Sequence, residues 1–130
     1  MKVVVTDASA LVEYLLRTER SGPVDRAVAD PDADLHVPAL CDVEVVAALR
    51  RALLTHTLNE PRAREALSDY EALPVTRHGH QDVLHRALDL RHNFSAYDAV
   101  YVALAEGLKA ELVTADDALA SASRKYLRPR

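Results

Sequence analysis

Four acidic residues lie beside or within short apolar segments spread along the chain: Asp7, Glu44, Asp98 and Asp116. Asp7 follows the β-branched run at residues 3–6, and Asp98 opens an apolar stretch. A carboxylate in such a place is costly to bury unless a positive partner offsets its charge. A divalent cation that takes oxygen ligands from several strand and helix ends would offset all four. The pattern predicts a metal-dependent phosphate chemistry.

Helix capping offers an alternative explanation for most of these acids. Asp7 or Ser9 can be the N-cap of a following helix. The segments 95–98 and 114–117 both match a capping box, in which a hydroxyl residue and an acid three positions later bond each other's backbone. Each acid at a helix start therefore has a purely structural interpretation.

Glu44 is the acid that capping does not explain. It lies inside an apolar segment, and no basic residue lies one helical turn away. Pairing with Arg51 or His36 remains an alternative. Carboxylates held close together raise one another's pKa and oppose folding until a cation neutralises them. We therefore favour a metal site over capping alone.

The elements that must position these residues alternate between strands and helices. Strands are expected at 3–6, 35–37, 73–76 and 111–114, the third at a sheet edge because its proline cannot donate to a ladder. Helices are expected at 11–16, after Gly22-Pro23, from Pro38 through about Leu54, after the N-cap Asn59, at 83–90, at 95–107 and at 118–122. The helix from Pro38 is apolar nearly all round and is predicted to be largely buried.

This alternation predicts an α/β fold with three layers, α/β/α, around a central and mostly parallel sheet. Open sheets of this kind place their sites beyond the carboxyl ends of the strands, where Asp7 and Asp116 both lie.

Length and composition favour a single domain over residues 1–130. The chain is 49% hydrophobic and has no apolar run of the roughly 20 residues that a membrane span needs. It has 20 acidic and 16 basic residues, so without the four candidate metal ligands the numbers of acidic and basic residues are equal. The lone Cys41 and the absence of a signal peptide pattern lead us to expect a cytoplasmic protein.

Other chemistries fit poorly. With only three glycines the chain has no glycine-rich phosphate loop. Cys41 is expected to be a small buried hydrophobe, and no Cys/His arrangement for nucleophilic catalysis is evident. The spacing of His78, His80 and His92 does not match a zinc site, so surface positions or phosphate contacts are expected for them. Basic residues that can contact phosphates are Arg77, Arg91 and Arg124.

Four segments taken in order carry a resemblance to a known family. They are VTDASALV at 5–12, VPAL at 37–40 leading to Glu44, YDAVYVALA at 97–105, and LVTAD at 112–116. Together they resemble the PIN-domain nucleases, and most closely the VapC toxin branch of toxin–antitoxin pairs. The resemblance covers almost the whole chain.

This resemblance implies a PIN-like fold, dependence on Mg²⁺ or Mn²⁺, and endonucleolytic cleavage of RNA. It also implies a homodimer and a cognate antitoxin protein. By position, the catalytic and metal-binding quartet is Asp7, Glu44, Asp98 and Asp116, with Asp7 and Asp98 as direct ligands. Supporting positions are Ser9 and Thr114, while Asp117 departs from the pattern and can share or replace the role of Asp116.

Three rivals to this hypothesis remain. A receiver-like domain needs paired acids after the first strand, where this chain has Asp7 alone. A phosphatase of the haloacid-dehalogenase type needs a second acid two residues after the first, where this chain has Ser9. A catalytically silent PIN-like module would bind RNA or a protein and leave RNA intact.

Overall fold

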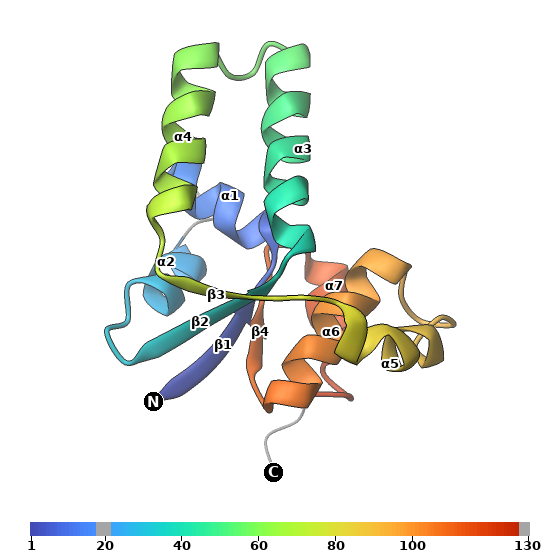
Figure 1. Ribbon diagram of the computed structural model, residues 1–130. Coiled ribbons are helices and arrows are strands. Elements are labelled where there is room, and N and C mark those ends of the chain that lie inside the picture. The colour runs from blue at the N-terminus through green and yellow to red at the C-terminus, as the bar shows by residue number, and fades with distance from the viewer. Residues whose placement is uncertain (18–21, 128–130) are drawn as a thin grey trace.

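A central parallel sheet organises the protein, whose computed structural model describes residues 1–17 and 22–127. Its strands are hydrogen-bonded in the order β3-β2-β1-β4, all parallel, with bounds β1 Lys2–Thr6, β2 Ala33–Pro38, β3 Val75–His78 and β4 Glu111–Val113. Val5 of the inner strand β1 pairs with His36 on one side and with Leu112 on the other. Helices flank this sheet (Figure 1), which confirms the predicted α/β fold.

The helices occupy nearly all the predicted segments. Their bounds are α1 Ala8–Leu16, α2 Gly22–Val28, α3 Leu40–Leu54, α4 Glu60–Ala72, a short 3₁₀ turn η2 Gln81–Val83 followed by α5 Leu84–Asp89, α6 Ala96–Leu108 and α7 Asp117–Ser123. The predicted N-cap Asn59 is confirmed, since its side-chain oxygen accepts from Arg62 N at 2.9 Å. Within the described part of the chain, no helix is both long and apolar enough to cross a membrane.

Helix α6 contributes to both hydrophobic clusters of the core. Tyr101 and Leu104 pack with β1, β2, α1, α3 and α4 in the larger cluster. Val102 and Ala103 pack with Leu119 and the 90–94 segment in the smaller one. Burial on two sides explains why apolar residues occupy more than one face of this helix.

Two predicted boundaries around prolines are wrong by about two residues. Pro38 ends β2 instead of opening a helix, because it still pairs with His78 across the sheet. The helix begins only at Leu40, after Ala39 N has donated to the His78 carbonyl at 2.8 Å. Strand β3 begins at Val75, so the proline of that segment precedes the strand, while its predicted edge position is confirmed.

The prediction that α3 is largely buried is also wrong. Cys41, Val45 and Leu49 are buried, but Val43 is 67% exposed and Val46 is 48% exposed. The reason is that α3 packs on α1 and α4 along one side only. Together with α4 it forms a helical hairpin that projects away from the sheet (Figure 1). An apolar sequence alone does not show how many neighbours a helix has.

Candidate active site

Asp7 lies at the junction of β1 and α1 with both carboxylate oxygens held. Its Oδ1 accepts from Ala10 N at 2.9 Å and from Ser9 Oγ at 2.8 Å, while the Thr114 hydroxyl donates to Oδ2. The residue is only 6% exposed. Asp7 is therefore the N-cap of α1, which confirms the capping interpretation and is compatible with a role of Asp7 in a metal site.

The segment after β4 is tied to Asp7 by the same hydroxyl groups. Ser9 Oγ accepts from Ala115 N at 3.1 Å, and Thr114 Oγ1 accepts from Asp116 N at 3.0 Å. The backbone adds a bond from Asp7 N to the Val113 carbonyl at 3.1 Å. Ser9 and Thr114 thus join two segments more than 100 residues apart.

The capping box predicted for residues 114–117 is wrong. Asp116, not Thr114, is the N-cap of α7, because its Oδ1 accepts from Leu119 N at 3.1 Å. The Thr114 hydroxyl is committed to Asp7 instead. Asp117 becomes the first residue of the helix and is exposed, as is Asp116.

Asp98 and Glu44 approach the site from two further helices. Asp98 is half-buried in the first turn of α6, whose predicted N-cap Ser95 is confirmed by a 3.1 Å bond from Asp98 N to Ser95 Oγ. Glu44 lies in the second turn of α3, and its Oε1 is buried with no hydrogen-bond partner among the described residues.

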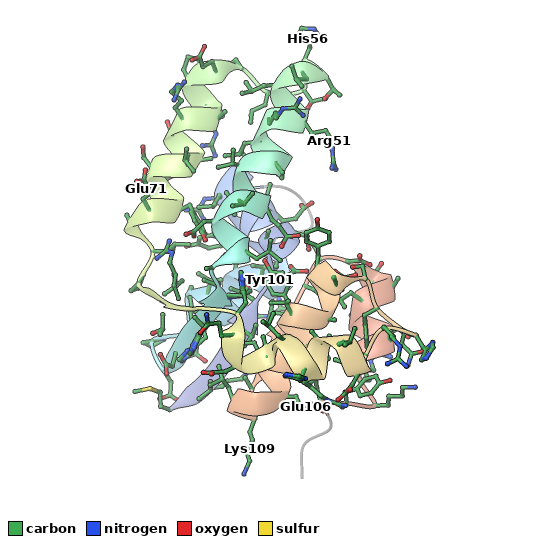
Figure 2. The ribbon with its side chains drawn as sticks, turned by 45° about the vertical axis from the view of Figure 1, so that its right-hand side comes forward. Arg51, His56, Glu71, Tyr101, Glu106 and Lys109 are labelled. Atoms are coloured by element: carbon green, nitrogen blue, oxygen red, sulfur yellow. The ribbon has the colours of Figure 1, made fainter. Side chains whose placement is uncertain are left out.

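The two ion pairs suggested for Glu44 are not formed. His36 instead bonds Asp34 Oδ2 through Nε2 at 2.8 Å and His78 through Nδ1 at 2.8 Å. Arg51 lies two turns further along α3, toward the tip of the projecting hairpin (Figure 2). Glu44 is therefore a half-buried acid with one buried oxygen, and the charges that act on it are those of Asp7 and Asp98.

Electrostatic coupling shows that the four predicted acids share one region. Burial is the main cause that raises the pKa of Asp7, Glu44 and Asp98 above its ordinary value. Repulsion adds to this, since Asp116 raises the pKa of both Asp7 and Asp98, and the charges of Asp7 and Asp98 raise that of Glu44. Hydrogen bonds from Thr114, Ala10 and Ser9 act in the opposite direction and lower the pKa of Asp7. The fold brings the quartet together at the carboxyl end of β1 and β4.

Tyr101 is a residue of this region that the sequence interpretation missed. It lies one turn after Asp98 on α6, is only 2% exposed, and its hydroxyl has no hydrogen-bond partner among the described residues. The hydroxyl lies near enough to Glu44 to lower the pKa of that carboxyl. Figure 2 shows Tyr101 where α6 lies beside the start of α3. The i, i+3 spacing from Asp98 was the available signal.

The histidines expected at the surface or on phosphates have partners in the protein. His78 bonds His36, and His80 Nε2 accepts from Leu40 N at 3.0 Å. His80 thus satisfies one of the free N–H groups at the start of α3, the helix that carries Glu44. The expected surface position is confirmed for His92, which is exposed, whereas His78 and His80 are half-buried because the β3–η2 connection folds over the first turn of α3.

The candidate phosphate-binding arginines differ in their surroundings. Arg77 Nε lies 2.9 and 3.1 Å from the two carboxylate oxygens of Asp42, which also accepts from the Tyr70 hydroxyl. Arg91 bonds the Leu88 carbonyl through Nη1 at 3.3 Å. Arg124 is exposed and lines an open pocket of about 380 Å³ together with Asn93, Ser121, Ala122 and Lys125.

The donor set suits a hard divalent cation. All four acids offer oxygen, the ligand that Mg²⁺ and Mn²⁺ prefer, and the buried Glu44 Oε1 has no other partner among residues 1–17 and 22–127. In that same part of the chain, no group of three or more Asp, Glu, His or Cys side chains forms a ready-made cage. Mg²⁺ keeps several waters and needs only one or two carboxylates, so the residues present fit a hydrated ion.

Sequence comparisons match the chain to a known domain family and to named proteins. A sequence model of the PIN domain family matches residues 4–125. A VapC ribonuclease of Mycobacterium bovis is 41% identical over 114 residues, covering 88% of this chain and 86% of the relative. Ribonuclease VapC12 of Mycobacterium tuberculosis is 36% identical over 118 residues, covering 91% and 90%.

A solved structure has the same fold. The crystal structure of Mycobacterium tuberculosis VapC20, described as a toxin that cleaves the sarcin-ricin loop, superimposes with a TM-score of 0.70. The match covers 92% of this chain and 94% of that chain at 17% sequence identity. At this identity the likeness supports the α/β/α architecture and nothing finer.

Proposed function

Because this chain belongs to the PIN domain family and to its VapC ribonucleases, we propose that it is an endoribonuclease toxin that hydrolyses RNA phosphodiester bonds at the acidic site. The observation that carries the proposal is the convergence of Asp7, Glu44, Asp98 and Asp116, whose charges act on one another although they come from four separate segments. Such a concentration of acids opposes folding, and a catalytic role explains why it is present.

The proposed cofactor is Mg²⁺ or Mn²⁺, held by the four acids. When bound, the cation lowers the pKa of a water molecule and offsets negative charge on the scissile phosphate. Asp7 is suited to be a direct ligand because Ser9, Ala10 and Thr114 fix its carboxylate. Asp98 is the second proposed direct ligand.

The exposed pair at the start of α7 leaves two assignments for the fourth acid. Asp116 raises the pKa of Asp7 and Asp98, and this effect favours it as the member of the quartet. Asp117 is the next residue and is also exposed, so it can share or replace that role.

Hydrolysis by this site needs no covalent intermediate on the protein.

The proposed partners follow from membership of the VapC group. They are an RNA substrate, read in a single-stranded or looped region, and a cognate antitoxin protein that neutralises the toxin. A homodimer and a cytoplasmic location complete the proposal.

Cleavage of total cellular RNA by the purified, antitoxin-free protein tests the function. We expect discrete fragments with Mg²⁺ or Mn²⁺, and intact RNA with EDTA or with Asp98→Asn. Asp89→Asn is the matched control, because Asp89 is an exposed acid on α5 outside the quartet. Intact RNA from a folded wild type that binds Mn²⁺ would contradict a general nuclease, and an RNA gel shift would then identify a silent binding module.

A further inference from the structure

Among the described residues, two buried polar atoms at the site lack hydrogen-bond partners, and they belong to neighbouring side chains. They are Glu44 Oε1 on α3 and the Tyr101 hydroxyl on α6. Leaving a buried hydroxyl or carboxylate oxygen unbonded is costly, so most such groups in proteins are paired. Both atoms lie among the described residues, and the side chains close enough to the Tyr101 hydroxyl to accept its hydrogen are those of Glu44 and Cys41.

We propose that Tyr101 is a positioning residue whose hydroxyl donates a hydrogen bond to Glu44 when the acidic site holds its cation. This bond commits one carboxylate oxygen of Glu44 to the phenol and leaves the other free. The inference rests on the proposed function, and it adds to the site a residue outside the acidic quartet.

The packing of Tyr101 suits it to this role. The ring is almost completely buried in the larger hydrophobic cluster, so its hydroxyl is held at a fixed place. Tyr101 and Asp98 lie one turn apart on the same face of α6, and Glu44 approaches from another helix. A rigid donor that connects two helices can hold a flexible glutamate side chain with little further loss of entropy.

Cys41 is the competing acceptor for the phenol, and it is the weaker one. The thiol lies close to both Tyr101 and Tyr70 and is completely buried. Burial raises the pKa of Cys41 to about 11, so its sulfur stays protonated and accepts hydrogen bonds poorly. A carboxylate accepts a phenol hydrogen far more strongly, because charge-assisted hydrogen bonds are about twice as strong as neutral ones.

Removing the hydroxyl alone tests the proposal. Tyr101→Phe keeps the ring, so the fold is expected to persist, as thermal unfolding without metal will show. We expect Mn²⁺ binding to the RNA-free protein, measured by calorimetry, to weaken about tenfold, the loss expected for one hydrogen bond to a charged group. Tyr97→Phe is the matched control on the same helix, because Tyr97 is 60% exposed.

A second readout separates positioning from general damage. RNA cleavage by Tyr101→Phe should fall at limiting Mn²⁺ and return to nearly the wild-type rate at saturating Mn²⁺. In a Glu44→Gln background, adding Tyr101→Phe should weaken Mn²⁺ binding no further, because the carboxylate that the phenol positions is already gone.

Three results would overturn the inference: wild-type Mn²⁺ affinity in Tyr101→Phe, an equal loss in the Glu44→Gln background, or a wild type that binds no Mn²⁺. Failure of the proposed function looks different. A wild type that binds Mn²⁺ but leaves RNA intact would contradict the nuclease and would leave the Tyr101 comparison valid.

Discussion

Replacing Asp7 by asparagine should stabilise the metal-free protein while it destroys the site. Asn is as good an N-cap as Asp, so its Oδ1 can still accept from Ala10 N and Ser9 Oγ. What disappears is a negative charge that is only 6% exposed and repelled by Asp116. The contact with Thr114 must also reverse its direction, with the Asn amide donating to the hydroxyl.

The expected gain is the difference between two opposing terms. Relief of the buried charge is worth roughly 2 kcal/mol, within the range of about 1–3 kcal/mol that burial of a polar group costs in mutational data. Replacing the charge-assisted bond from Thr114 by a neutral one costs about 1 kcal/mol, the difference between hydrogen bonds to charged and to neutral groups. We therefore expect the free energy of unfolding to rise by about 1 kcal/mol, equivalent to a higher Tm by about 4 °C for a domain of this size.

Urea unfolding in EDTA at pH 7 measures this change, and calorimetry with Mn²⁺ measures the loss of the site. Asp69→Asn is the control, because Asp69 is an exposed acid on α4 and its replacement should change stability by less than about 0.5 kcal/mol. A destabilised Asp7→Asn would show that the hydrogen bonds outweigh the buried charge. Full Mn²⁺ affinity and RNA cleavage in this variant would refute the assignment of Asp7 as a ligand.

The remaining predictions concern pH, a helix cap and the core. The raised folded-state pKa values of Asp7, Glu44 and Asp98 mean that these acids bind more protons in the folded protein, so their contribution to metal-free stability should increase as pH falls from 7 toward about 4.5. The lowered pKa of His78 acts in the opposite direction, so urea titrations at several pH values are made on a His78→Gln variant, in which a decrease would contradict the raised values. His80→Ala should lower the free energy of unfolding by about 1 kcal/mol through loss of its bond to Leu40 N, whereas the exposed His85→Ala should not; equal effects would refute the cap. Leu11→Ala, at a fully buried position, should lower the free energy of unfolding in urea by about 3–4 kcal/mol. A loss below about 1 kcal/mol would show that Leu11 is not part of a tightly packed core.

Much of the fold was readable from local patterns. The β-branched run before Asp7 predicted a strand at residues 3–6, and β1 spans Lys2–Thr6. Ser95 and Asn59 were identified as N-caps because capping is a contact within four residues, which a sequence displays directly. The errors at Pro38 and in the burial of α3 arose where a neighbouring element decides the outcome, namely β3 in one case and the projecting hairpin in the other.

The sequence by itself determined which acids are candidates, because carboxylates beside apolar segments are visible without a structure. It did not show what holds them. Asp7 and Thr114 are 107 residues apart, and their hydrogen bond exists only because β1 and β4 are neighbours in the sheet. Within the part of the chain that the structure describes, Glu44 Oε1 has no hydrogen-bond partner, and this and the approach of Tyr101 likewise depend on how α3 and α6 meet. Local periodicity fixes the face that a residue occupies on its own helix or strand. Which residue packs opposite that face depends on contacts between distant segments, and only the tertiary structure decided these contacts.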